Sequence, residues 1–303
     1  MAEVNEASAV RDAALLPASD PEASRSRFDE MKDTLASAHV LAALAILAVI
    51  ALAGILAPLL WTSDPLALNP RLRLRPESAA HWLGTDPFGR DMYSRVLYGA
   101  RISLLVGLAV AVVSVAIGLL LGLVAGYFRL LDAIIMRIMD GVMAIPGILL
   151  AIALVTLSGA SLLTVVVAIA VSEIPRVVRL VRSVILTVRT EPYVEAAIAL
   201  GTPTPVILLR HMVPNTVAPL IVQGTFIFAA AMLTEAGMSF LGVGLPPEVP
   251  SWGNIMAEGR TYFQLRPGLI LYPGLLLALT VLSVNVLGDA LRDALDPRLA
   301  RRL

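Results

Sequence analysis

Six long apolar stretches, separated by polar and proline-containing segments, are the feature of this chain that most limits its fold. Hydrophobic residues make up 58% of the 303 residues and charged residues only 15%, and the mean hydropathy is +0.83. A helix of about 20 apolar residues crosses the hydrocarbon core of a bilayer. The chain is therefore predicted to be an all-α integral membrane protein with six transmembrane helices.

The predicted spans differ in regularity. The third contains Pro146-Gly147, which should kink it or leave backbone groups for neighbouring helices to satisfy. The fourth continues past Pro175 into an arginine-bearing extension. In chain order, the predicted spans cover residues 39–61, 102–128, 133–157, 161–188, 216–241 and 269–291.

The distribution of Lys and Arg predicts the orientation, because these residues are enriched in cytoplasmic loops. An even number of spans puts both termini on one side, and cytoplasmic termini place most of the 23 Lys and Arg residues inside. The loop between the first two spans opposes this orientation with a run of arginines from Arg71 to Arg75, which we expect to meet lipid headgroups. The balance favours cytoplasmic termini.

This topology divides the chain into four parts. Residues 1–36 are polar and Ala/Ser-rich and are predicted to be a disordered cytoplasmic tail. Residues 37–101 form the first transmembrane helix and an extracytoplasmic loop. Residues 102–292 form a core of five transmembrane helices that includes a cytoplasmic segment at 189–215, and residues 293–303 form a cytoplasmic C-terminal tail.

The 189–215 segment is too short and too broken by proline to span a bilayer, and it predicts two short helices meeting at an angle. Thr190 or Glu191 can cap the first helix, with Pro192 in its opening turn. Gly201 is placed to end that helix in a left-handed conformation. Thr204-Pro205 then provides a new cap and first residue. A helix of about nine residues is about 14 Å long, which suits a knob that fills a groove in a partner.

This segment resembles the cytoplasmic coupling signature of ABC importer permeases, which docks onto an ATPase. Glu-Ala-Ala alone is a common tripeptide, and the extended spacing carries the resemblance. His211 stands where the general pattern has Ile, and Val213 where it has Leu; His before x-x-Pro-Asn is similar to the peptide-importer branch. The predicted coupling residues are Glu195, Ala196, Ala197, Gly201, His211 and Pro214.

Two further stretches resemble the C-type subunit of dipeptide, oligopeptide and nickel permeases. One runs from Gly84-Thr85-Asp86-Pro87-Phe88-Gly89-Arg90-Asp91 to Arg101-Ile102-Ser103-Leu104. The other runs from Glu235-Ala236-Gly237-Met238-Ser239 to Pro250-Ser251-Trp252-Gly253. The chain is thereby identified as resembling this subunit from about residue 80 to residue 253.

The resemblance implies a type I ABC importer permease fold in a bacterial cytoplasmic membrane. It also implies a homologous B-type permease, two ATP-binding subunits that bind ATP and Mg²⁺, and an extracytoplasmic substrate-binding protein. The cargo would be a dipeptide or oligopeptide, with nickel or another small solute as the alternative. Two interpretations from other classes remain: a secondary transporter or channel, and an assembly or signalling subunit that moves nothing itself.

Ionisable residues in membrane spans are costly and mark candidate sites. Glu173 and Asp289 lie near Arg176 and Arg292 and are expected to form ion pairs. Glu235 lies in the outer half of its span, where it either packs or forms hydrogen bonds at a gate, or attracts the amino terminus of a peptide. Met232 and Met238 are candidates for an adaptable lining of the same path, although Met in a span more often packs.

The charged residues before the second span have a simpler interpretation. Asp86 and Asp91 lie near Arg90 and Arg95, which predicts an interfacial lead-in helix with exposed salt bridges of about 0–1 kcal/mol each. Direct contact with substrate or a binding protein is the alternative.

Several functions are excluded by what the sequence lacks. A P-loop needs a lysine after glycines, and the single lysine, Lys32, follows none. With no Cys, three dispersed His residues and no recognisable Ser/His/Asp set, we expect no catalytic site, metal or cofactor in this chain. A net charge of +0 offers no surface for nucleic acid.

Overall fold

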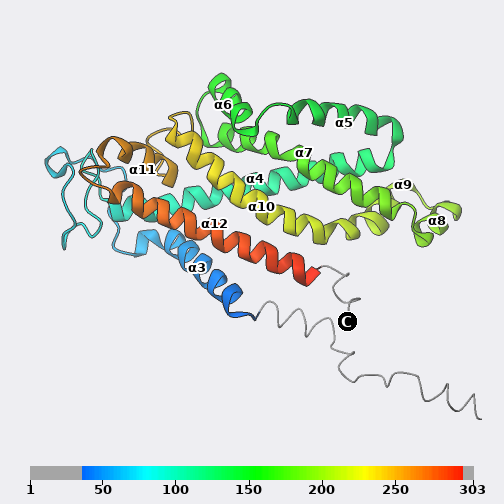
Figure 1. The fold of residues 1–303 in the computed structure, drawn as a ribbon, viewed down its shortest axis with the longest axis horizontal. Helices are drawn as coiled ribbons and strands as arrows, with labels where there is room; N and C mark the ends of the chain where they lie inside the picture. Colours follow the sequence, from blue (N-terminus) through cyan, green and yellow to red (C-terminus); the bar gives the residue numbers. More distant parts are fainter. Residues whose placement is uncertain (1–35, 296–303) are drawn as a thin grey trace, which may run out of the picture.

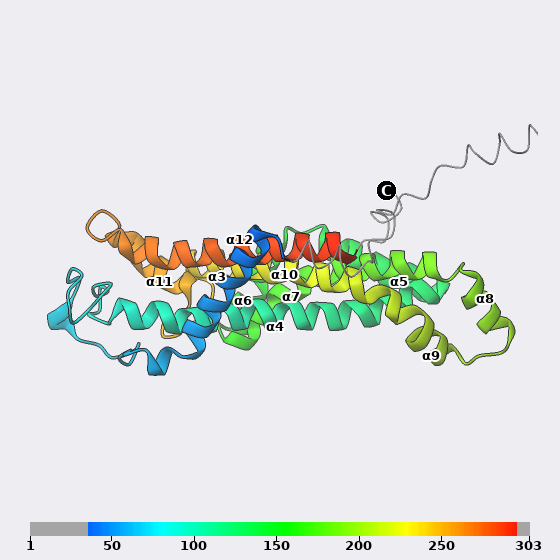
Figure 2. The same cartoon turned by 90° about the horizontal axis from the view of Figure 1, so that it is seen from below.

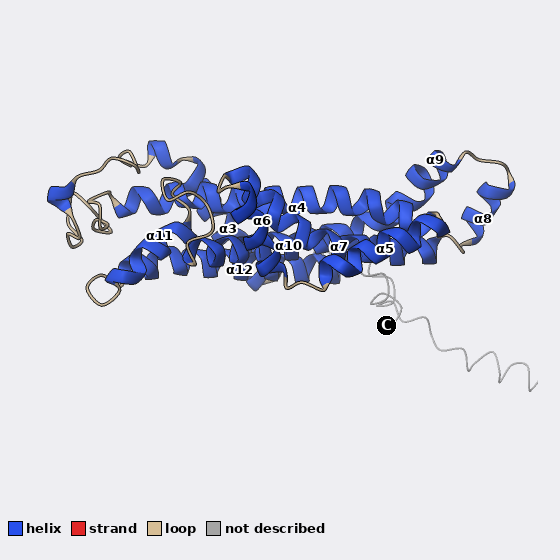
Figure 3. Cartoon of the chain, turned by 90° about the horizontal axis from the view of Figure 1, so that it is seen from above, coloured by secondary structure: helices blue, strands red, loops and turns tan. Residues whose placement is uncertain are grey.

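The computed structural model describes residues 36–295, which are helical and contain no β-strand (Figure 3). The predicted tail 1–36 and most of the tail 293–303 lie outside the described residues. The longest helices run along one long axis, and the 56–91 loop and the helices at 252–259 and 192–206 lie at its two ends (Figure 1). The helices are α3 (Ala38–Ile55), α4 (Met92–Tyr127), α5 (Arg129–Met143), α6 (Gly147–Ser158), α7 (Leu162–Val188), α8 (Pro192–Ala199), α9 (Thr204–Val206), α10 (Val213–Phe240), α11 (Trp252–Gly259) and α12 (Gly268–Leu295).

The apolar stretches form the long helices. Of the described residues, α3, α4, α12 and the run from α9 through α10 are long and apolar enough to cross a membrane, and α5 with α6 makes a fifth span if a bent pair counts as one. The pair bends by 89° around Pro146, as the predicted kink required. The predicted fourth span, α7, is one helix, but its Glu173 and its arginines place it outside this apolar set. The structure therefore supports four or five apolar spans rather than an established six.

Two predicted boundaries shift. The first helix ends at Ile55, and Ala57–Leu59 forms a separate 3₁₀ turn with Pro58 at its start, so helix does not continue to Trp61. The second long helix begins at Met92, ten residues before the predicted span, because the Asp91 carboxylate accepts a hydrogen bond from the Ser94 amide at 2.8 Å. The cap therefore adds a polar extension to an apolar span.

The centre of the fold is the contact between α4 and α7. Gly118, Gly122 and Gly126 form a groove on α4, and a Cβ on Gly122 would lie 2.6 Å from Cβ of Val181. A Cβ on Gly126 would lie 2.6 Å from Cβ of Ile185. Small residues at four-residue spacing let helices approach closely in a membrane. The arginine-rich α7 is thereby held against the most apolar long helix.

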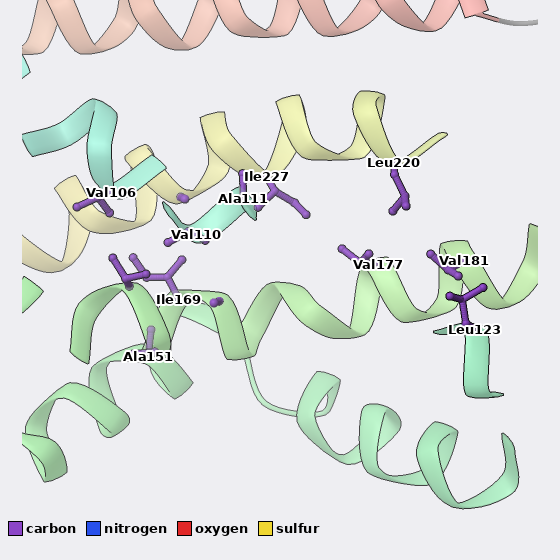
Figure 4. Close-up of a cluster of buried hydrophobic side chains, with 14 of the residues drawn as sticks. Val106, Val110, Ala111, Leu123, Ala151, Ile169, Val177, Val181, Leu220 and Ile227 are labelled. Carbon is purple, nitrogen blue, oxygen red and sulfur yellow. The ribbon is translucent and has the colours of Figure 1, made fainter. Parts of the chain in front are cut away.

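A buried cluster joins this pair to α6 and α10 (Figure 4). Val177 and Val181 of α7 point toward Leu220 of α10, and Ile169 lies near Ala151 of α6. Two groups of shorter segments lie at opposite ends of the long helices: α8 and α9 at one end, and α11 with the 56–91 loop at the other (Figure 2). These two ends carry the sites described below.

Candidate functional site

The helix α8 has the start and the end that the sequence predicts. Pro192 lies in its first turn, and Glu191 occupies the cap position without a side-chain capping bond. Gly201 has a φ of +75°, its N–H donates to the Ile198 carbonyl, and the Thr202 N–H donates to the Ala197 carbonyl, both at 3.0 Å. This is a Schellman motif, in which a left-handed residue costs glycine little. Space around Gly201 is open, because a Cβ added there would have no atom within 4 Å.

The second short helix differs from the prediction. Helix begins at Thr204 with Pro203 in the cap position, and α9 continues through a π-helical turn at Ile207–Met212 into α10. No glycine interrupts this stretch, so nothing forces the chain out of a helical conformation. Pro214 lies in the first turn of α10, and the Asn215 amide donates to the His211 carbonyl at 2.7 Å. The segment therefore consists of one short helix, α8, which we call the knob, and a continuous helical stretch from Thr204 into α10, which we call the stem.

The knob is fixed to the bundle by its inner face. Val194 is fully buried and belongs to the same apolar cluster as Ile207 and Met212. Ile185 and Val188, at the end of α7, belong to this cluster as well. The exit of α7, the knob and the entry to α10 therefore form one packed unit.

The outer face of the knob carries apolar groups in the open. Glu195 and Ala196 are exposed, whereas Ala197 is buried. Leu200 is 85% exposed and Leu209 68% exposed. Both leucines lie in or next to the segment that the sequence predicts to dock on a partner. Of the other predicted coupling residues, Gly201 and Pro214 are exposed and His211 is half-buried.

Sequence reasoning missed the contact that holds the knob to its stem. The Asn215 amide donates to the Tyr193 hydroxyl at 3.2 Å, and the rings of Tyr193 and His211 lie 6.2 Å apart. These three side chains span 22 residues of sequence and meet only because the segment folds back. The polar Asn directly after a proline was the one available signal.

Ion pairs link α5 to the half of α7 that leads to the knob. Arg182 binds both carboxylate oxygens of Asp132, at 2.5 and 2.6 Å, and Arg179 binds Asp140 at 2.7 Å. The predicted pair of Glu173 with Arg176 is confirmed at 3.2 Å. For Asp289 and Arg292 the structure gives no ion pair among residues 36–295. A displacement of the knob would therefore be transmitted through α7 to α5.

The predicted path residues lie at the other end of α10. Met232, Met238 and Glu235 are all fully buried in this chain. Oε1 of Glu235 accepts hydrogen bonds from the hydroxyls of Ser239 at 2.9 Å and Ser251 at 2.8 Å. Its Oε2 has no partner in the described part of the chain. Glu235 is therefore packed and hydrogen-bonded within the chain, whereas its role at a gate and its contact with a peptide stay predictions.

Ser251 makes this carboxylate part of a latch for α11. Its hydroxyl caps α11 by accepting a hydrogen bond from the backbone N–H of Asn254 at 3.1 Å, and it donates a hydrogen bond to the Glu235 carboxylate. The indole N–H of Trp252 donates to the Val96 carbonyl of α4 at 3.0 Å. A Cβ on Gly253 would lie 2.7 Å from Cα of Ala236, so α11 and α10 touch through backbone. The stretch from Glu235 to Gly253 therefore builds a packed end of the bundle, opposite the knob.

The charged residues before α4 are buried rather than exposed, which corrects the sequence interpretation. Arg95 is fully buried, and its guanidinium contacts Asp86 at 2.5 Å and Glu258 at 2.7 Å. Arg90 binds the same two carboxylates, both at 2.5 Å. Glu258 belongs to α11, 163 residues beyond Arg95, and no local pattern pointed to it. Two arginines and two carboxylates thus balance in charge.

Burial raises the pKa of the Glu258 carboxyl to about 7, against the lowering effect of Arg90. The residues that the structure describes contain no group of three His, Cys, Asp or Glu side chains that could hold a metal ion. The ion pairs of Arg90 and Arg95 with Glu258 join the 84–95 region to α11, and we call this network the clamp.

Comparisons with known proteins agree on one class. Residues 114–301 match the model of a family described as binding-protein-dependent transport system inner membrane component. A probable peptide ABC transporter permease protein of Sinorhizobium fredii is 53% identical over 247 residues, which cover 82% of this chain and 85% of the relative. The dipeptide transport system permease protein DppC of Alkalihalophilus pseudofirmus is 45% identical over 249 residues, covering 82% of each. The glutathione transport system permease protein GsiD of Pectobacterium atrosepticum is 45% identical over 223 residues, covering 73% and 74%.

Proposed function

The chain belongs to the family of binding-protein-dependent transport system inner membrane components, and on this premise we propose that it is the permease subunit of an ABC transporter that imports short peptides. The names of its relatives support peptides as the cargo. The observation that carries the role in this chain is the knob α8, which is packed on one face and presents Glu195, Ala196 and Leu200 on the other. A membrane protein that exposes such a face outside its spans offers it to a soluble partner.

The proposed assembly contains two permeases and two ATPases. A homologous B-type permease lies beside this chain, two ATP-binding subunits carry ATP and Mg²⁺ below it, and an extracytoplasmic binding protein delivers the peptide. The chain itself is not an enzyme. The orientation has both termini in the cytoplasm of a bacterium, with six crossings in which α5–α6 and α7 are the third and fourth.

The proposed mechanism follows the packing. When the ATPases close, they displace the knob, and the unit of α7, α8 and α10 tilts as one body because Val194, Ile207 and Met212 join its parts. The ion pairs of α7 carry α5 along. At the other end of α10, Glu235, Met232 and Met238 form the outer gate, closed by burial in this conformation. Hydrolysis resets the equilibrium between the two states.

The test is Gly201→Asp in the complex reconstituted in vesicles with its partner permease, ATPases and binding protein. The backbone position suits only residues that tolerate a left-handed conformation, and open space surrounds it. We expect loss of ATP-driven peptide uptake because the carboxylate enters the surface that docks on the ATPase. Normal uptake would refute the coupling role.

Two controls separate docking from backbone strain. Gly201→Asn introduces a side chain of the same size as Asp that tolerates the left-handed conformation and carries no charge. Gly159→Asp places the same carboxylate at another open glycine, with φ of +86°, between α6 and α7. Both controls should retain uptake. Omission of the chain should abolish uptake, which distinguishes a permease from an accessory subunit.

A further inference from the structure

A cavity of about 530 Å³ lies between α7, α10 and α12, in the half of the bundle that carries the knob. Its walls include Leu180 of α7 and Val222 and Phe226 of α10. Its polar lining consists of Asn215 and Gln223 of α10 and Arg292 of α12. Neither the coupling residues nor the proposed outer gate account for these groups.

The polar residues of α10 share one face. Asn215, Pro219 and Gln223 recur at four-residue spacing, which places them above one another on a helix. Gln223 lies ten residues into α10, about 15 Å along the helix from its first residue. Its side-chain amide has no hydrogen-bond partner among residues 36–295. Polar side chains in a span face protein or a water-filled cavity, so this amide is available to a ligand.

The backbone adds a further acceptor on this face. Pro219 lies inside α10 and has no N–H with which to bond the Asn215 carbonyl. The backbone carbonyl of Asn215, which lies beside the cavity, therefore lacks the N–H donor that it would have in a regular helix.

Arg292 supplies the only charge among the lining residues. It is exposed in the last turn of α12, and it forms no ion pair within the described part of the chain, although Asp289 and Asp293 are close in sequence. A guanidinium presents paired donors that match the two oxygens of a carboxylate.

We propose that this cavity holds the peptide in the inner half of the translocation path and reads its backbone rather than its side chains. The Gln223 amide both donates to and accepts from a peptide group, the Asn215 carbonyl accepts an N–H, and Arg292 binds the C-terminal carboxylate. Leu180, Val222 and Phe226 accept side chains of many kinds. This inference rests on the proposed function and deepens it by naming the residues that contact the cargo.

A lipid headgroup is the competing ligand for Arg292. A phosphate would satisfy the guanidinium, but it carries no N–H donor for the Gln223 side-chain carbonyl, which lines the same cavity. A peptide carries both a carboxylate and backbone amides, so the two lining residues together favour it.

The test measures peptide uptake by the reconstituted complex with Gln223→Leu and Arg292→Gln. We expect each variant to reduce uptake by about tenfold, with binding-protein-stimulated ATP hydrolysis retained, because each removes one polar partner of the cargo. Asn285→Leu is the matched control, since Asn285 lies ten residues from the end of α12 and does not line the cavity. Arg137→Gln, at an exposed arginine of α5, controls for loss of charge.

A dipeptide whose C-terminal carboxylate is replaced by an amide tests the role of Arg292 directly. We expect the wild-type complex to move a free dipeptide faster than its C-terminal amide once both are delivered at saturation, and Arg292→Gln to reduce that difference. An unchanged difference would remove Arg292 from the site.

Photo-cross-linking supplies a readout besides transport. A dipeptide with a diazirine side chain, trapped during turnover, should label the 215–226 stretch of α10 or Leu180. Labelling confined to other segments, or labelling of the cavity by a diazirine phosphatidylglycerol that the peptide does not compete with, would overturn the proposal. If the wild-type complex shows no ATP-driven peptide uptake, the proposed function fails and this inference with it; wild-type uptake with unaffected variants refutes the cavity alone.

Discussion

The side chains that stand out at the two ends of this molecule differ in their exposure to solvent. At the end that is inner in the proposed orientation, Leu200 directly after the knob is 85% exposed, and Leu209 in the π-helical turn that follows is 68% exposed. At the opposite end, which is the outer end in the proposed orientation, Arg95 and Asp86 are buried to within 1% of complete burial, and Arg95 pairs with both Asp86 and Glu258. Apolar groups are thus left in the open where charged groups are expected, and charged groups are enclosed where an exposed loop is expected.

The difference indicates which of these two sets of residues finds its partners within the chain. The outer end satisfies its buried charges within the chain, through a clamp that joins the 84–95 region to α11, and the Glu235 latch joins α11 to α10. The inner end satisfies only its inner face through Val194 and leaves the opposite face uncovered. Substitutions at the outer end should therefore change stability, and substitutions at the inner end should change association with a partner.

The strongest test of the outer end is Arg95→Met. Removing the guanidinium leaves Asp86 and Glu258 facing each other in a buried site with Arg90 alone, and breaking a buried pair costs about 3–5 kcal/mol. Unfolding of the purified chain in mixed detergent–SDS micelles measures the loss. Arg260→Met, which removes an exposed arginine that donates to the Phe240 carbonyl, should change stability far less. Equal losses would mean that the network is no clamp.

The latch should contribute less than the clamp. Ser251→Ala removes the cap of α11 and one of the two donors to Glu235, so we expect a loss of about 2 kcal/mol in the same unfolding measurement. Ser158→Ala, at an exposed serine at the end of α6, is the control. A loss no larger than that of the control would show that α11 is held by the apolar contacts of Trp252.

Titration of Glu258 gives the outer end a pH dependence. Because its pKa is raised from 4.5 to about 7, the folded chain holds this proton over an interval in which the unfolded chain has released it. The contribution of this group to the free energy of unfolding therefore falls as pH rises from 4.5 to about 7, by at most about 1.4 kcal/mol per pH unit. Melting temperatures across this window should lose that slope in Glu258→Gln. A slope retained in the variant would assign it to another group.

The smallest effect on stability belongs to the inner end. Leu200→Ser and Leu209→Ser change exposed side chains and should alter the free energy of unfolding by no more than about 0.5 kcal/mol. The same variants should weaken co-purification with the ATP-binding subunits, because the exposed leucines are the apolar part of the docking face. Undiminished co-purification, measured beside Leu282→Ser at an exposed leucine of α12, would place the docking face elsewhere.

The sequence by itself determined the features that depend on local chemistry. Runs of apolar residues fix helices because an isolated backbone in hydrocarbon must satisfy its own hydrogen bonds. Gly201 ends α8 and Pro146 bends the third span for reasons contained in those residues and their neighbours. The family could be recognised for the same reason, since the spacing of its motifs is contained in continuous stretches of sequence.

Tertiary structure decided which charges are buried and which polar groups remain without partners. Asp86, Arg90 and Arg95 resemble a solvated loop until Glu258 arrives from α11, 163 residues beyond Arg95, and closes the network. Gln223 and Arg292 resemble incidental polar residues until the packing of α7, α10 and α12 places them around one cavity. The clamp and the cavity both depend on the axial position of one helix relative to another. That position is set by contacts such as those of the glycine groove of α4 with α7. No pattern within a single segment contains that register, because it is the sum of many weak contacts between segments far apart in the chain.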